Sequence, residues 1–170
     1  MARSRARRRG CADAHARVTH VSRATLQKTV VCLINRQRRA HGLPGLRESA
    51  RLNRSAQGWT NVMVNDHEFT HGTNFSARIS AVGFDWSSAG ENIATGFGTA
   101  SAVVRGWMAS TGHCENILSP VYRDVGTGIS NRAVPGYSSR GATWTQDFGL
   151  WMGRAQESHN YGAAAGCPYG

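Results

Sequence analysis

Residues 103–118 read VVRGWMASTGHCENIL, the most informative stretch of the sequence for the fold. The segment around its start, residues 99–110, predicts a helix whose first turn Thr99 or Ser101 can cap. Residues 111–120, TGHCENILSP, predict one brief helical turn, which ends at Pro120 because proline cannot continue a helix. The stretch thus combines a tryptophan-bearing helix with a histidine-bearing turn.

Further helices are expected before this stretch. Apolar residues recur every three or four positions over residues 24–40 and again from Glu48 to Asp66, a spacing that predicts two amphipathic helices. A short third helix is expected from residue 75 onward, closed by Gly83. In the second helix the residues expected to face inward are Leu52, Ala56, Trp59, Val62 and Met63.

Two late segments favour β-strands. Residues 124–130 read DVGTGIS and residues 142–150 read ATWTQDFGL, in which Trp144, Gln146 and Phe148 alternate with smaller or polar residues. Residues 89–98, AGENIATGFG, are bracketed by glycine and are expected to be extended or loop-like. Helices first and strands last, without regular β-α alternation, predict an α+β fold.

The net charge of +10 is unevenly distributed over the 170 residues. Up to Arg23 there are seven arginines, and Asp13 is the one acid. We expect residues 1–23 to be a basic, disordered arm, because they offer little apolar surface to bury. An arginine-rich nucleic-acid arm is the alternative. No aromatic interleaving follows it, so a nucleic-acid partner is disfavoured.

Four cysteines, Cys11, Cys32, Cys114 and Cys167, lie far apart and form no C-x-x-C motif. An even number of scattered cysteines suits two disulfides and an oxidising compartment, with four unpaired thiols as the alternative. We expect Cys11 to pair with Cys32, because Cys11 shortly precedes the helix that contains Cys32. A Cys114–Cys167 bond would fix the glycine-rich tail, residues 154–170, to the turn that carries Cys114.

The segment His67-Glu68-Phe69-Thr70-His71 completes an H-E-x-x-H motif, which on a helix holds zinc and supplies a general base. That use requires the helix to continue through both histidines. Here Gly72 follows at once, and the apolar periodicity ends before His67. We interpret the match as accidental, with a zincin-like protease as the alternative.

Six segments occur in the order expected of a CAP domain: CLINRQRRAHGLPGL, FTHG, AGENIATG, VVRGWMASTGHCENIL, VGTGIS and TWTQDFG. The chain resembles this superfamily, also called the SCP domain, which includes cysteine-rich secretory proteins, antigen 5 and plant pathogenesis-related class 1 proteins. Its G-H-x-x-N-I-L segment is most similar to the bacterial branch. The resemblance covers about residues 24–150 and implies a three-layer α-β-α sandwich with a shallow central cleft. We therefore assign a CAP domain to residues 24–153.

The resemblance also implies a set of cleft residues. His71 in FTHG matches the family's first histidine, Glu91 in GENIA a cleft glutamate, and His113 the cleft histidine of the bacterial branch. Ser110 and Thr143 stand where the eukaryotic pattern has a glutamate and a second histidine. The secondary candidates are Glu115, Ser110 and Gln146. On a helical turn, Glu115 should face away from His113, two residues before it.

Two imidazoles and one carboxylate would suit zinc or another divalent cation, with one coordination position left open. The same three side chains could instead hydrogen-bond to one another and fix the surrounding loops. The sequence leaves both interpretations open.

Two classes of function follow. The first is a secreted, non-enzymatic module that binds a lipid, a cell-wall component or a protein partner through the cleft. The second is a metal-dependent hydrolase that uses His71, Glu91 and His113. A Ser110–His113 hydrolase is disfavoured, because no aspartate to orient the histidine and no G-x-S-x-G motif is evident.

We expect the binding module, because the chain shows no convincing nucleophile or general base. An extracellular or envelope location is expected, although the basic N-terminus lacks the apolar part of a signal peptide. No apolar run approaches the roughly 18 residues that a membrane-spanning helix needs.

Overall fold

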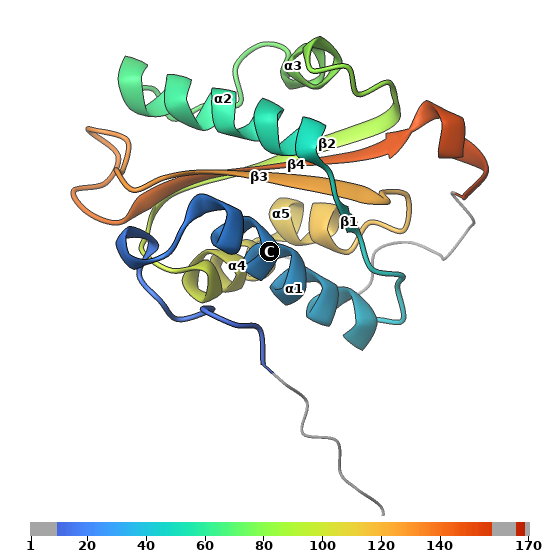
Figure 1. Cartoon of the computed structure of the whole chain (residues 1–170), viewed down its shortest axis with the longest axis horizontal. Coiled ribbons are helices and arrows are strands. Elements are labelled where there is room, and N and C mark those ends of the chain that lie inside the picture. The colour runs from blue at the N-terminus through green and yellow to red at the C-terminus, as the bar shows by residue number, and fades with distance from the viewer. Residues whose placement is uncertain (1–9, 158–165, 169–170) are drawn as a thin grey trace, which may run out of the picture.

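The fold is a sheet between two helical layers, in a computed structural model that describes residues 10–157 and 166–168. Its elements in chain order are η1 (Val18–His20), α1 (Arg23–Ala40), β1 (Arg47–Glu48), α2 (Ala50–Asp66), α3 (Phe75–Ala81), β2 (Trp86–Phe97), α4 (Ala100–Met108), α5 (Thr111–Ile117), β3 (Asp124–Ser130), β4 (Ala142–Trp151) and η2 (Met152–Glu157). Figure 1 shows α1, α4 and α5 on one face of the sheet and α2 and α3 on the other. The expected three-layer α-β-α sandwich is confirmed.

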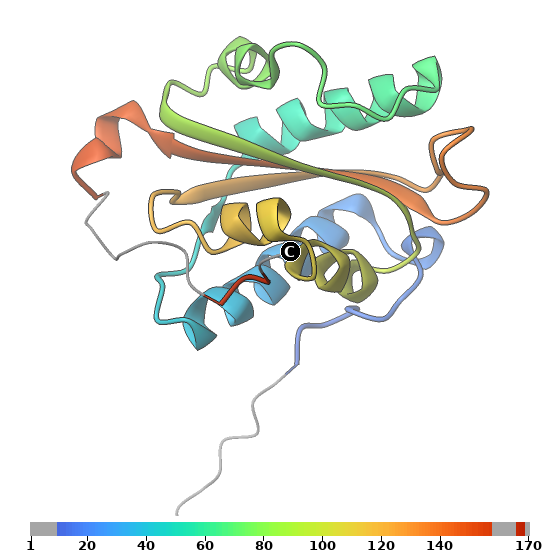
Figure 2. The same cartoon turned by 180° about the vertical axis from the view of Figure 1, so that it is seen from behind.

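The strands follow the order β1-β3-β4-β2. Strand β4 pairs antiparallel with both β3 and β2, whereas the two-residue β1 runs parallel to β3. Strand β2 includes most of residues 89–98, which the sequence predicted to be either extended or loop-like. It lies at one edge of the sheet, so residues from both helical layers can reach it around that edge (Figure 2).

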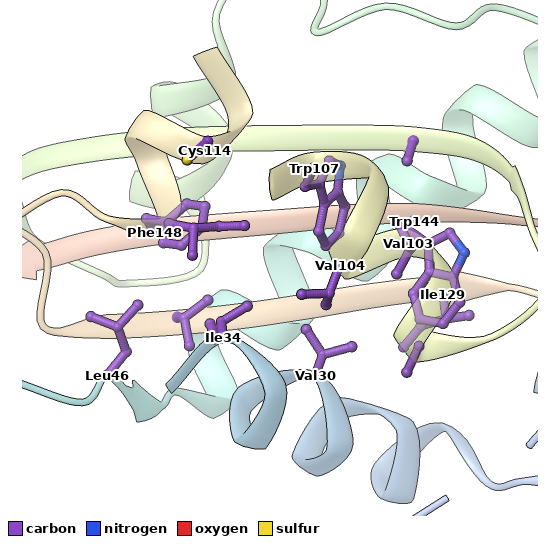
Figure 3. Close-up of a cluster of buried hydrophobic side chains, with 14 of the residues drawn as sticks. Val30, Ile34, Leu46, Val103, Val104, Trp107, Cys114, Ile129, Trp144 and Phe148 are labelled. Atoms are coloured by element: carbon purple, nitrogen blue, oxygen red, sulfur yellow. The ribbon is translucent and has the colours of Figure 1, made fainter. Parts of the chain in front are cut away.

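The larger hydrophobic core fills the space between the sheet and the layer of α1, α4 and α5. In Figure 3, Val30 and Ile34 of α1, Trp107 of α4, and Trp144 and Phe148 of β4 gather in one cluster. All five side chains are buried. Burial of a large apolar side chain contributes about 1.5–3 kcal/mol, so this layer supplies much of the stability.

Helix α2 packs directly on β3 through two glycines. A Cβ atom on Gly126 would overlap the α2 backbone at Leu52, and one on Gly128 would overlap it at Ala56. The two glycines of the GTG sequence in β3 are therefore required for packing, because they allow the backbones of α2 and β3 to come into direct contact.

Arg38 is the one arginine of α1 that is fully buried. Its guanidinium donates to the carbonyl oxygens of Pro44 at 2.8 Å, Ile117 at 2.8 Å and Ser119 at 2.7 Å. Burial, and secondarily the charge of Arg123, lowers the pKa of Arg38 to about 10. The side chain ties the end of α5 to α1, which fixes the position of α5 on the sheet.

The second helix departs from its sequence pattern at one residue. Leu52, Ala56 and Met63 are buried, as expected, and Trp59 is partly buried. Val62 is 39 % exposed, so its predicted inward orientation is wrong. Adjacent helical positions point about 100° apart, and Met63 occupies the inward direction.

Both predicted disulfides are present. Cys11 bonds to Cys32 with the Cα atoms 5.8 Å apart, and Cys114 bonds to Cys167 with the Cα atoms 5.6 Å apart. The described residues contain no free cysteine. The alternative of four unpaired thiols is therefore excluded.

The segment from residue 10 to residue 22 packs against the domain. Ala14 and Val18 are buried, and the amide of Val18 donates to the carbonyl of Gly98 at 3.0 Å. The basic arm expected over residues 1–23 is corrected accordingly, because its second half joins the fold. Residues 1–9 and the tail residues 158–165 and 169–170 lie outside the described part of the chain.

Candidate functional site

Glu91 is the centre of a polar cluster at the β2 edge of the sheet. We call this group the edge cluster; its members are His71, Arg78, Glu91, Ser110 and His113. The side chain of Glu91 is 1 % exposed. Oε1 accepts a hydrogen bond from Nδ1 of His71 at 2.8 Å, and Oε2 accepts one from Nη2 of Arg78 at 2.6 Å. Both oxygens of the buried carboxylate are thus engaged, one by an imidazole and one by a guanidinium.

Arg78 organises the loop that carries His71. Its guanidinium donates to the carbonyl of His71 at 3.0 Å and lies 3.9 Å from the centre of the Trp59 ring. The indole of Trp59 donates to the carbonyl of Thr70 at 2.8 Å, and Asn74 caps α3 by accepting from the amide of Ala77 at 3.0 Å. Helices α2 and α3 therefore hold this loop against β2.

His113 approaches the edge from α5. Its Nδ1 lies 3.0 Å from the hydroxyl of Ser110, the residue just before the helix. Burial, and then the proximity of His71, lowers the pKa of His113 below its usual value. The neutral form of the His113 imidazole is therefore favoured.

Side-chain amides link α5 to β2 and β4. Asn116 donates to the carbonyl of Glu91 at 3.1 Å and to Oδ1 of Asn92 at 2.9 Å. Asn92 donates to Oε1 of Gln146 at 3.3 Å and to the carbonyl of His113 at 3.2 Å. Gln146 is thus buried within the amide network, on the α5 side of the sheet.

Glu115 is exposed on α5, in agreement with the orientation expected from its spacing. Thr143, at the position of the eukaryotic second histidine, is buried and donates to the carbonyl of Arg132 at 2.9 Å. Its role in this structure is to hold the β3–β4 connection.

Asp147 is a buried acid that the sequence analysis did not single out. It lies directly opposite Glu91 in the β2–β4 register and is 0 % exposed. Burial, and then the charge of Glu91, raises its pKa well above the usual value. The hydroxyl of Ser55 lies beside Asp147. Among the described residues, however, no side chain makes a well-formed hydrogen bond with either oxygen of the Asp147 carboxyl group.

The H-E-x-x-H motif does not lie on a helix. Helix α2 ends at Asp66, and His67 adopts a left-handed conformation with φ of 59° as its C-cap. His67 and Glu68 are both exposed, whereas His71 belongs to the edge cluster. The motif therefore lacks the continuous helix that would place both histidines on one face.

The predicted metal set of His71, Glu91 and His113 does not form in this geometry. No three His, Cys, Asp or Glu side chains of the described residues gather as a group that could hold a metal ion. Arg78 places a positive charge on the second oxygen of Glu91, where a divalent cation would be repelled. The arrangement fits an ion pair with its own hydrogen bonds better than a zinc site.

The sandwich and its edge cluster define a CAP-type domain. The family model of the cysteine-rich secretory protein family matches residues 31–148. The chain belongs to this family.

Two relatives of similar sequence come from Bacillus subtilis. The uncharacterized protein YkwD is 35 % identical over 127 residues, which are 72 % of this chain and 46 % of YkwD. The uncharacterized membrane protein YlbC is 30 % identical over 64 % of this chain and 32 % of its own length. The chain therefore spans less than half the length of either relative.

Two solved bacterial structures share the fold. An extracellular SCP-domain protein of Bacillus anthracis has a TM-score of 0.64 at 24 % identity, covering 76 % of this chain and 44 % of that one. An outer surface protein of Borrelia burgdorferi has a TM-score of 0.65 at 20 % identity, covering 74 % of this chain and 92 % of that one.

Proposed function

We propose that this chain is a non-enzymatic binding module that acts outside the cell or in the cell envelope. The two disulfides suit an oxidising compartment. The B. anthracis relative is described as extracellular and the B. burgdorferi relative as an outer surface protein. Within the described residues, no helix has the length and hydrophobicity to span a membrane.

The observation that carries the non-enzymatic assignment is the saturation of Glu91. A general base needs a carboxylate oxygen free to take a proton from water or from a substrate. Here His71 and Arg78 engage both oxygens of the buried carboxylate, one through an imidazole and one through a guanidinium. This engagement of Glu91 supports the binding module over the metal-dependent hydrolase, our second class of function.

The Ser110–His113 pair does not restore a nucleophile. The serine is bonded to Nδ1 of a histidine three residues further along the chain, which is an ordinary local contact. Among the described residues, no carboxylate hydrogen-bonds to His113, so nothing of the triad type orients its ring.

The ligand class follows from the groups that the edge cluster presents. His71 is half-exposed, and Ser110 and His113 are partly exposed, so the accessible groups are imidazoles and a hydroxyl. The charges of Glu91 and Arg78 are already paired. A neutral, hydroxyl-rich ligand matches such groups better than a lipid chain, and among the expected ligands the glycan of a cell-wall component fits best.

Calorimetric titration with soluble peptidoglycan glycan fragments tests this proposal. We expect the wild type to bind, and His71→Ala and Ser110→Ala to weaken the affinity by about tenfold or more, which corresponds to the loss of one well-formed hydrogen bond in a binding site. His67→Ala, an exposed histidine four residues from His71, is the matched control and should bind like the wild type. No binding by the wild type, or equal losses in all three variants, would refute the proposal.

A further inference from the structure

A second candidate site lies between α1 and α4, away from the edge cluster. A groove of about 770 Å³ runs between the two helices, lined on α1 by residues from Cys32 to Ala40 and on α4 by residues from Ser101 to Arg105. The two helices are neighbours in the same layer (Figures 1 and 2). None of the lining residues belongs to the edge cluster.

Three arginines dominate the groove. Arg36 and Arg39 line it from α1, and Arg105 lines it from α4. All three are exposed, and none makes a side-chain hydrogen bond or an ion pair with another described residue. Neither helix contains an aspartate or a glutamate. Each guanidinium therefore keeps its five donors for a ligand, with no carboxylate in either helix to compete.

The spacing of the arginines suits an extended anion. Arg36 and Arg39 are three residues apart on one helical face, which separates them by about 4.5 Å along the helix axis. Arg105 approaches from the opposite wall, so charge is offered from both sides of the groove. The Cys11–Cys32 disulfide fixes the N-terminal segment to α1 at a residue that itself lines the groove.

We propose that this groove binds a phosphate-rich linear polyanion. Guanidinium groups match phosphate oxygens in a bidentate way and stay charged at any physiological pH. Among the described residues, no aromatic side chain lines the groove, so they provide no stacking surface for the bases of a single-stranded nucleic acid. The site is distinct from the edge cluster, and either site can fail without the other.

Titration with inorganic polyphosphate at about 0.15 M salt tests the groove, because weak surface attraction is largely screened there. The groove variant is Arg36→Gln/Arg39→Gln/Arg105→Gln. The matched control is Arg54→Gln/Arg132→Gln/Arg140→Gln, which removes the same charge from exposed positions on α2 and the β3–β4 connection. We expect the groove variant to lose at least about tenfold in affinity and the control less than about threefold. Circular dichroism confirms that both variants fold.

Three outcomes would overturn the proposal. Equal losses in both triple variants would mean that only the net charge matters. Loss of binding on deletion of residues 1–9, with the groove variant unaffected, would place the site in the arginine-rich N-terminus. Groove-dependent binding to vesicles of anionic phospholipid, without binding to polyphosphate, would identify a membrane surface as the ligand.

Discussion

Arg78 donates to Glu91 at 2.6 Å, and this ion pair compensates a carboxylate that is almost completely buried. Arg78→Gln should therefore lower the free energy of unfolding by about 3 kcal/mol, because it leaves a buried charge with one partner fewer. Urea unfolding of the variant beside the wild type measures this loss.

The control for this variant is Arg54→Gln, an exposed arginine of α2 that should change stability by less than about 0.5 kcal/mol. The double variant Arg78→Gln/Glu91→Gln should recover part of the loss, since the buried charge of Glu91 is then also removed. Equal stability of Arg78→Gln and Arg54→Gln would show that the pair is not what holds the edge cluster.

Asp147 should make stability fall as the pH rises from the acid range. Its folded-state pKa is raised above the usual value of 3.8, so the folded protein retains this proton when the unfolded chain has lost it. The stabilisation from this group is complete below pH of about 3.8 and declines as the pH rises through the raised pKa.

Asp147→Asn should remove that dependence and raise the melting temperature at pH 7 by at least about 2 °C, with a smaller gain at pH 4. Scanning calorimetry at both pH values measures the difference. Asp85→Asn, an exposed acid before β2, is the control and should show no such pattern. A lower melting temperature for Asp147→Asn at pH 7 would mean that the ionised carboxylate is needed.

His67 sits in a left-handed C-cap, a conformation that glycine adopts without steric cost. His67→Gly should raise the free energy of unfolding by about 0.5–1 kcal/mol. If the segment were a zinc-protease motif, the same substitution would remove a metal ligand and abolish proteolysis. Urea unfolding and a casein digestion assay of this variant and Glu68→Gln test both accounts. Proteolysis by the wild type that either substitution abolishes would restore the protease interpretation.

The two disulfides should differ in their contribution to stability. Cys114 and Cys167 are separated by 53 residues and Cys11 and Cys32 by 21. Loop-closure entropy gives about 4 kcal/mol for the longer loop and about 3 kcal/mol for the shorter one. Urea unfolding of the two double Cys→Ala variants measures the order. A greater loss without Cys11–Cys32 would indicate that packing of residues 10–22 outweighs loop closure.

The sequence predicts the helices well, because their apolar spacing and their stops are local. Thr99 caps α4 as one of the two expected residues, and both late strands appear where they were placed. Strand β2 was ambiguous, since its glycines suit a loop as well as an edge strand. The packing of Ala14 and Val18 was not predicted, because two apolar residues in an arginine-rich segment form no recognisable pattern.

The edge cluster was predicted only in part. His71 and Glu91 meet as the family resemblance implies, and His113 approaches them from α5. Arg78 was missed because nothing local distinguishes it from other helical arginines; its role depends on where α3 lies. One feature of the sequence could have identified Asp147. It is an acid inside a predicted strand, and it faces the opposite side of the sheet from its neighbours Gln146 and Phe148.

The affinity of the wild type for soluble peptidoglycan glycan fragments, measured in EDTA and again with added zinc, distinguishes a metal-independent binding module from a metal-dependent hydrolase. A binding cluster built on the Arg78–Glu91 pair should give the same dissociation constant in both conditions, with the fragments recovered intact by mass spectrometry. Binding that requires zinc, or fragments that are cleaved, would contradict the account and restore the metal-dependent hydrolase.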